Sequence, residues 1–352
     1  MSNPLVVSIS NLAAYTPQET IELVSRSGVK RGNMRPDKVF LSAVSAGCLL
    51  GFGCGVSLCA MTAPWYSENA PGLVKLFGAG VFPLGLVLVV LTGADLFTAT
   101  TMFTLTAVLQ RRLPIRKMLL HWFLCFFGNL AGSLFVMSII MGYGGVFDAS
   151  PYKEVVMSFA GKKQISPQVH QIFLKAIGCN WLVCLAVFLG IQAKDLASKV
   201  IGMWWPIFAF VVLGLEHVVA NMFYMSLAIW LKTPDLTVGL YIWKGMIPAM
   251  VGNIIGGGMF VGVYYWYMYL FDEDPVKPAP QLNNGPMKSA ALEVFYEVES
   301  NGFTSDQNEL SCHGVGDTVR DRDLHLRGET IFLHSSRDIS TESPRQVLPW
   351  PI

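Results

Sequence analysis

The stretch Gly214-Leu215-Glu216-His217-Val218-Val219-Ala220-Asn221 places two ionisable side chains in the middle of an apolar run. That run extends from about residue 204 to residue 231, which is long enough to cross a bilayer as a helix. Charged groups at that depth are costly and usually face a bundle interior or a wet cavity. The flanking glycine and asparagine indicate a helix broken near the midplane, where transporters place their sites. The alternative is a buried polar pair that only locks two helices together.

The composition predicts one membrane domain with two polar ends. The 352 residues are 53% hydrophobic and 14% charged, with a mean hydropathy of +0.47, whereas soluble domains carry roughly 25% charged residues. We expect a cytoplasmic segment with a short amphipathic helix at 1–38, a pore domain at 39–271 and a disordered cytoplasmic tail at 272–352. A net charge of +1 gives no reason to expect nucleic acid. The seven cysteines contain no Cys-x-x-Cys pair and are expected to be small buried hydrophobes, so we expect no metal and no cofactor.

Six apolar segments predict an all-α membrane protein with six transmembrane helices. They lie at about 39–61, from 73 to the basic residues that begin at 111, and at 118–141, 169–191, 204–231 and 239–271, and the second is interrupted on the way. Before them, Thr16-Pro17-Gln18-Glu19 is typical of a helix start and predicts a short helix from Thr16 to Arg26. Lysine and arginine are denser in 1–38, 110–117 and 193–200 than in the other loops, so both termini are expected in the cytoplasm. The lysines of the loop after the third span, which include Lys163, would then lie outside, where they either attract anions or are simply solvated.

An internal repeat relates the two halves of the apolar region. Gly93-Ala94-Asp95 corresponds to Gly214-Leu215-Glu216, 121 residues later, and the Gly-Asn-x-x-Gly motif at 128–132 returns 124 residues later at 252–256. Because each half contains three spans, the halves must be inverted relative to the membrane. The sequence therefore predicts an inverted 3+3 repeat in which the second and fifth helices are broken. Within the breaks, the carboxylates of Asp95 and Glu216 are expected to accept backbone hydrogen bonds.

His217 is the histidine that lies deepest in an apolar run, and we expect it to be the only one of the six in such a place. Imidazole is the side chain most easily protonated near physiological pH, and the N-termini of half-helices favour anions. A small anion that takes a hydrogen bond or a proton from His217 can cross an apolar constriction as a neutral weak acid. Phe210 lies seven residues earlier, about two helical turns, which predicts that it lies above His217 on the same face.

These motifs resemble those of the formate/nitrite transporters over nearly all of residues 16–271. The most specific matches are residues 93–98, Asn180 with 182–187, Glu216-His217 with 220–223, and 252–258. The resemblance implies an aquaporin-like protomer and a homopentamer with one pore per subunit. It makes His217 the central pore histidine and Thr98 its hydrogen-bonding partner.

The resemblance also implies the remaining residues of the pore. Its polar residues would include Asn180 on the fourth span and Asn253 on the sixth, together with Glu216 and Asn221. Its apolar constrictions would be Phe82, Leu86, Leu96 and Phe210.

The expected function is proton-linked transport of a small monovalent anion or its weak acid. The polar tail is longer than in bacterial members of that family and suggests a eukaryote such as a fungus, which favours nitrite uptake at the plasma membrane. Formate, lactate or another short monocarboxylate is the alternative substrate. A water or neutral-solute channel would share the broken helices, but the sequence has no paired Asn-Pro-Ala triplets. An enzyme is not expected, because there is no Ser/His/Asp set and no Gly-rich phosphate loop. A receptor or scaffold would not need a histidine at the midplane.

Overall fold

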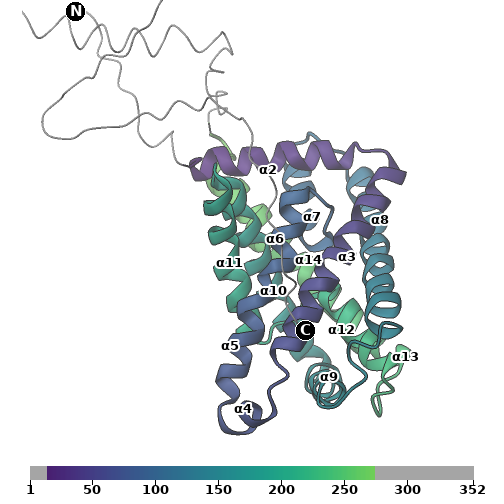
Figure 1. The fold of residues 1–352 in the computed structure, drawn as a ribbon. Coiled ribbons are helices and arrows are strands. Elements are labelled where there is room, and N and C mark those ends of the chain that lie inside the picture. Colours follow the sequence, from purple (N-terminus) through teal and green to yellow (C-terminus); the bar gives the residue numbers. More distant parts are fainter. Residues whose placement is uncertain (1–13, 274–352) are drawn as a thin grey trace, which may run out of the picture. The chain divides into compact units, whose positions relative to one another are not determined.

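The computed structural model describes residues 14–273, which belong to one compact unit (Figure 1). Within these residues the chain is helical and has no strand beyond a single bridge between Ala14 and Ala193. The all-α prediction is therefore confirmed for this part of the chain. Residues 1–13 and the predicted tail from residue 274 lie outside the described residues.

Helix α2 (Pro17–Gly32) lies across one end of the helix bundle (Figure 1). It begins where the sequence predicts, because the Thr16 hydroxyl accepts the Glu19 N–H while the Glu19 carboxylate accepts the Thr16 N–H. The helix runs beyond the predicted end at Arg26. Its apolar face is buried, with Ile21 inaccessible to solvent, and packs on α7 (Phe97–Leu109). The short N-terminal helix is thus part of the folded unit.

Five helical segments of the described residues are long and apolar enough to cross a membrane. They are α3 (Pro36–Ala60), α5 (Pro71–Val81) continued by α6 (Pro83–Thr92), α8 (Ile115–Phe135) continued by η1 (Val136–Gly142), α10 (Val169–Gln192), and the run of α13 (Val238–Leu240), η3 (Tyr241–Met246), α14 (Ile247–Gly257), η4 (Gly258–Val263) and α15 (Tyr264–Tyr269). The predicted segment 204–231 is divided, as its predicted break requires, between two shorter helices, α11 (Leu196–Val212) and α12 (Val218–Trp230). The connecting helices α4 (Pro64–Asn69), α9 (Tyr152–Ala160) and η2 (Gly161–Ile165) complete the described part.

Both predicted helix breaks are present, and each follows a glycine. Gly93 has a φ of 77° and ends α6, and Gly214 has a φ of 67° after α11. Glycine adopts this left-handed conformation without the strain that a side chain would add. After each glycine the chain runs through a short non-helical segment before α7 begins at Phe97 or α12 begins at Val218.

A buried asparagine holds the first break in place. The Asn129 Oδ1 accepts the N–H of Phe97, the first residue of α7, at 2.8 Å. Its Nδ2 donates to the carbonyl oxygens of Asp95 at 2.9 Å and of Ala43 on α3 at 2.8 Å. One side chain on α8 therefore ties the extended segment, the new helix and α3 together.

A second asparagine makes the same three contacts at the second break. The Asn253 Oδ1 accepts the N–H of Val218, the first residue of α12, at 2.8 Å. Its Nδ2 donates to the carbonyl oxygens of Glu216 at 2.9 Å and of Ala176 on α10 at 2.8 Å. Asn129 and Asn253 belong to the two Gly-Asn-x-x-Gly motifs, so the 124-residue repeat corresponds to a repeated structural support.

The glycines of these motifs allow close packing of neighbouring helices. A Cβ on Gly132 would lie 2.0 Å from the Val44 carbonyl oxygen, and one on Gly256 would lie 2.2 Å from the Ile177 carbonyl oxygen. Both distances are far below van der Waals contact, so any larger residue would push α8 from α3 or α14 from α10. Small residues at such contacts are a general feature of membrane helices.

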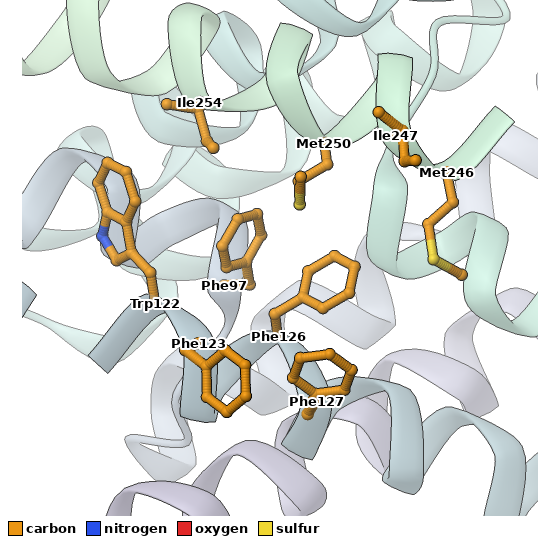
Figure 2. A pocket seen from close by; sticks show the side chains of 9 residues that line it. All are labelled: Phe97, Trp122, Phe123, Phe126, Phe127, Met246, Ile247, Met250 and Ile254. Carbon is orange, nitrogen blue, oxygen red and sulfur yellow. The ribbon is translucent and has the colours of Figure 1, made fainter. Parts of the chain in front are cut away.

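A separate apolar cavity of 340 Å³ lies between α8 and the helices η3 and α14. Figure 2 shows its two walls, with the aromatic side chains of α8 opposite Met246, Ile247, Met250 and Ile254. Trp122, Phe123 and Phe126 stand 124 residues before Met246, Ile247 and Met250, so repeat-related positions face each other. Because its lining is apolar, this cavity offers no group that would bind an anion.

Candidate permeation site

His217 is the residue immediately before the second half-helix, α12. It is 3% exposed and caps α12, with its Nδ1 accepting the Ala220 N–H at 3.0 Å. Its other ring nitrogen, Nε2, lies 2.9 Å from the Thr98 Oγ1 on α7. The imidazole therefore connects the two half-helices, and the structure brings His217 and Thr98 together in the pair that the sequence predicts.

The backbone contact determines which ring nitrogen carries the proton. A backbone N–H can only donate, so the Nδ1 that faces Ala220 must present its lone pair. The ring is then neutral with its proton on Nε2, and Nε2–H donates to the Thr98 hydroxyl. Thr98 keeps its own hydroxyl hydrogen for another acceptor. Protonation of Nδ1 would require the contact with Ala220 to break.

Aromatic rings cover the histidine on one side. The Phe210 ring stacks on the His217 ring with centroids 6.0 Å apart and planes 24° apart. The Phe82 ring packs against the Phe210 ring in a T-shaped contact, with ring centroids 5.4 Å apart and ring planes at 88°. Leu86 and Leu96 are buried in the same apolar cluster. All four predicted constriction residues are thus buried, and ring contacts join Phe82 to Phe210 and Phe210 to His217.

The predicted proximity of Phe210 and His217 is present, but the reason given for it is wrong. Helix α11 ends at Val212, and the chain between Leu213 and His217 is not helical. Two helical turns therefore do not separate the two residues. The chain reverses direction at Gly214, which has a positive φ, and this turn places the His217 ring against the Phe210 ring near the end of α11.

Asn180 connects α10 to both α7 and α14 from a fully buried position. Its Nδ2 lies 3.0 Å from the Thr98 carbonyl oxygen, 3.1 Å from the Thr101 Oγ1 and 2.6 Å from the Asn253 carbonyl oxygen. Two amide hydrogens are thus shared among three protein acceptors. Asn180 holds the residue that faces His217. Asn253 likewise uses both of its amide hydrogens on backbone carbonyls, which gives it a supporting place beside the site.

The Glu216 carboxylate is held by side chains of two other elements. Its Oε1 lies 3.0 Å from the Lys163 Nζ, and its Oε2 accepts a hydrogen bond from the Asn221 Nδ2 at 2.8 Å. Lys163 also donates to the Leu215 carbonyl oxygen at 2.9 Å. This lysine on η2 is therefore neither solvated nor free for anions, contrary to both alternatives for its loop. Asn221 and Glu216, which are predicted together as polar residues of the pore, are therefore hydrogen-bonded to each other.

The Asp95 carboxylate is held in a corresponding way from the opposite end of the bundle. Its Oδ1 pairs with the Arg31 guanidinium on α2, which also lies 5.0 Å from the centre of the Phe103 ring. The Asp95 N–H donates to the Ser42 Oγ at 3.0 Å. Within residues 14–273, no backbone N–H donates to the carboxylate of Asp95 or Glu216. The predicted backbone partners are wrong, because basic residues of the peripheral helices reach both buried acids.

Sequence reasoning missed several of these partners. His121 on α8 is only 2% exposed, so His217 is not the only histidine deep in an apolar run. The sequence did not predict that Arg31 and Lys163 pair with the buried acids. Asn129 was visible as the repeat partner of Asn253, 124 residues earlier, but that signal was not used to assign it a role.

Outside the spanning helices, Glu22 links α2 to the turn between α7 and α8. Burial raises the pKa of Glu22, but hydrogen bonds from Arg112 and Arg26, both at 2.7 Å, outweigh it and hold that pKa below its ordinary value. Glu22 is therefore ionised at neutral pH. Its ion pairs help to keep α2, which carries Arg31, on the end of the bundle.

Known proteins share both the sequence and this arrangement of helices. A family model described as formate/nitrite transporter matches residues 18–267. The chain belongs to the formate/nitrite transporter family. The probable formate transporter of Methanothermobacter thermautotrophicus is 36% identical over 72% of this chain and 97% of its own length. The formate channel FocA of Escherichia coli (strain K12) is 31% identical over 73% of this chain and 95% of its own length. An uncharacterized transporter of Saccharomyces cerevisiae is 33% identical, over 72% of this chain but 40% of that protein.

Solved structures agree with this assignment. One described as an FNT family ion channel has a TM-score of 0.65 and 28% identity, covering 71% of this chain and 98% of that one. A pentameric formate channel with formate bound has a TM-score of 0.59 and 31% identity, covering 67% of this chain and 98% of that one. The predicted resemblance is confirmed for the family. Family membership and the long apolar helices identify a multi-pass membrane protein of a transporter and channel family.

Proposed function

We propose that this protein moves a small monovalent anion across a membrane with a proton, through a pore centred on His217 in each protomer. The observation that carries the proposal is the hydrogen bond between His217 and Thr98 where the two half-helices meet, under the stacked Phe210 ring. A buried polar pair beside an apolar constriction fits a substrate that is an anion in water and a neutral acid inside. The apolar rings select against hydrated ions, since shedding water from an unpaired charge is costly.

The site recognises the anion through a fixed hydrogen-bond chain. The Ala220 N–H orients His217, Nε2–H donates to Thr98, and the Thr98 hydroxyl hydrogen is offered to the substrate. Asn180 donates to the Thr98 carbonyl oxygen and so fixes the backbone that carries the hydroxyl. A carboxylate or nitrite oxygen that accepts this hydrogen is polarised toward its neutral acid.

Proton linkage follows from the same chain. If an anion takes the proton of Nε2 through Thr98, the ring must gain a proton on Nδ1, because an imidazolate is not accessible near neutral pH. That step replaces the contact between Nδ1 and Ala220. External acid favours it twice, by supplying the proton and by raising the fraction of neutral weak acid. Uptake is therefore expected to rise as external pH falls.

Nitrite and formate are the two substrates that we propose. The family description includes both anions, whereas the relatives named above are a probable formate transporter and a formate channel. Larger monocarboxylates such as lactate would have to pass between Phe82 and Phe210, which lie 5.4 Å apart between ring centres. A neutral-solute channel remains the alternative from another class.

The assembly and topology are also part of the proposal. We propose a homopentamer, which the pentameric formate channel among the similar structures supports. Six spans in an inverted 3+3 repeat are supported by the identical contacts of Asn129 and Asn253 at the two breaks. The distribution of lysine and arginine supports cytoplasmic termini, and the yeast relative supports a fungal source. The plasma membrane is the location that we propose.

Initial uptake in whole cells tests the function. Cells that lack their own nitrite and formate transporters would express this protein and receive labelled nitrite, formate or glycerol over a range of external pH. We expect saturable uptake of nitrite, formate or both, which rises in acid, and no gain in glycerol uptake over control cells. Glycerol uptake without anion uptake would contradict the proposal and favour a neutral-solute channel.

A further inference from the structure

The two buried acids differ in how completely they are paired. Glu216 has a contact at each carboxylate oxygen: Oε2 accepts a hydrogen bond from Asn221, and Oε1, which has no hydrogen-bond partner, forms an ion pair with Lys163 at 3.0 Å. Asp95 is 1% exposed and pairs through Oδ1 with Arg31, but its Oδ2 has no hydrogen-bond partner within residues 14–273. A buried carboxylate oxygen without a donor is costly.

The repeat explains why that oxygen lacks a partner. Asn221, which serves Glu216, stands 121 residues after Thr100, the corresponding position in the first half. The Thr100 hydroxyl donates to the Phe97 carbonyl oxygen at 2.9 Å, inside its own helix. The donor that the second half uses is therefore spent elsewhere in the first half, and Asp95 needs a donor from another element.

His121 on α8 is the side chain placed to supply it. It is 2% exposed, and neither ring nitrogen has a hydrogen-bond partner within the described part of the chain. Its Nε2 lies 3.9 Å from the Asp95 Oδ1. That distance is too long for a direct hydrogen bond but is one that a single bridging water spans. Oδ1 already pairs with Arg31, so a water that takes the Nε2 hydrogen completes the carboxylate by also reaching the neighbouring Oδ2, which has no partner.

We propose that His121 is the second partner of Asp95, through one bound water, and that it positions the constriction of the pore. The Asp95 carbonyl oxygen accepts hydrogen bonds from Asn129 at 2.9 Å and from the Cys125 Sγ at 3.1 Å. These bonds hold Asp95, and with it the non-helical segment before α7, against α8. Leu96 follows Asp95 directly, and Thr98 lies three residues on. His121 touches neither substrate nor His217 and acts only through Asp95. The proposal rests on the transport function proposed above.

Replacement of His121 gives the first test. His121→Leu leaves the Asp95 carboxylate short of one donor, which lets residues 95–98 shift, whereas His121→Asn and His121→Gln keep a side-chain N–H. We expect His121→Leu to lower maximal uptake per surface protein about tenfold, the factor that corresponds to one hydrogen bond to a charged group. It should also change the ratio of formate to lactate uptake, and at least one amide variant should restore both values.

A matched control separates this effect from general damage to α8. Ser133 is 1% exposed on the same helix and donates to the Gly47 carbonyl oxygen at 3.4 Å, away from Asp95. Ser133→Ala should leave the ratio of formate to lactate uptake unchanged. If His121→Leu also leaves rate and ratio unchanged, or if both amide variants are as impaired as His121→Leu, the proposal is overturned.

A second measurement does not depend on transport. Melting temperatures of the purified proteins are compared for wild type, His121→Leu, Asp95→Asn and the double variant. Because the two residues share one contact, the double variant should melt above the value expected from adding the single effects. Additive effects would overturn the contact. Absence of anion uptake by wild type would instead contradict the proposed function, while this comparison would still test His121 and Asp95.

Discussion

The two broken helices of this transporter share one scaffold but end in different chemistry. In each, a glycine in the left-handed conformation follows the first half-helix. In each, an asparagine side chain accepts the first N–H of the second half-helix, and these two asparagines are 124 residues apart. In each, a buried acid pairs with a base of a peripheral helix. The N-cap residue of the second half-helix differs between the two halves. It is Leu96 in the first half and His217, 121 residues later, in the second.

That difference shows how a repeated fold acquires a single site. His217 caps α12 by accepting the Ala220 N–H, whereas Leu96 makes no side-chain cap for α7. The first half therefore contributes an apolar wall and the Thr98 hydroxyl, and the second contributes the imidazole. The scaffold is duplicated, but the hydrogen-bond chain is not.

The largest effect is expected from the two supporting asparagines. Asn129→Leu and Asn253→Leu each leave the first N–H of a half-helix buried without its partner, and Asn253→Leu also removes the donor to the Glu216 carbonyl oxygen, at a cost of about 1–3 kcal/mol per group. We expect both variants to lose nearly all folded protein, measured by size-exclusion chromatography of a fluorescent fusion. Asn69→Leu on α4, whose side chain bonds only the Trp65 carbonyl oxygen, should stay folded. If only one of Asn129→Leu and Asn253→Leu folded normally, the two asparagines would not have equivalent structural roles in the two halves.

The ion pair of the second half gives the next largest effect. Lys163→Gln leaves the buried Glu216 carboxylate without its cation, which costs about 3–5 kcal/mol when one partner of a buried pair is lost. Surface expression should fall severalfold. The double variant Lys163→Gln with Glu216→Gln removes both charges and should recover much of that loss. If the double variant is no better than Lys163→Gln alone, the charge of Glu216 is not what Lys163 stabilises.

A smaller effect, on selectivity, is expected at the constriction. Phe210→Ala removes the ring that stacks on His217 and meets Phe82, so larger monocarboxylates should pass. Competition by lactate and propionate against the native substrate measures this. Phe126→Ala, which removes a buried ring that lines the separate apolar cavity, is the matched control and should leave competition unchanged. Equal competition in wild type and Phe210→Ala would remove Phe210 from the pore.

The smallest effect concerns the attachment of α2, which carries the base of the first half. The pKa of Glu22 is lowered in the folded protein, so its ion pairs stabilise the fold above the ordinary glutamate pKa of about 4.3 and lose that contribution as pH falls below it. Wild type should melt slightly above Glu22→Gln at neutral pH, and the difference should vanish as pH falls through about 4. A difference that is constant with pH would contradict this role of Glu22.

The sequence predicted the elements that are encoded locally. The Thr16 cap, five of the six apolar segments and the two Gly-x-acid breaks depend on neighbouring residues, and each appears in the structure where it was predicted. The pair of His217 and Thr98 came from the resemblance to a family, because 119 residues separate the two.

The partners that the sequence missed all come from distant elements. Nothing near Arg31 or Lys163 in the chain indicates that they reach Asp95 and Glu216, since only the packing of α2 and η2 on the bundle brings them there. The error over Phe210 has a similar origin. The spacing of two helical turns assumes that the helix continues through residues 213–217, although Gly214 indicates that it ends there.

The pH dependence of uptake by His217→Asn tests the central claim most directly. Asparagine retains a hydrogen-bond donor for Thr98 but cannot carry a proton at any pH used, so a chemical role for His217 must be lost. Initial uptake of nitrite and formate is measured from about pH 5 to 8, a range that spans the titration of histidine, and is normalised to surface protein. We expect uptake by wild type to rise in acid, and uptake by His217→Asn to be strongly reduced or to leak with a different pH profile. Equal rates and equal pH profiles for the two proteins would contradict the claim that His217 carries the transport chemistry.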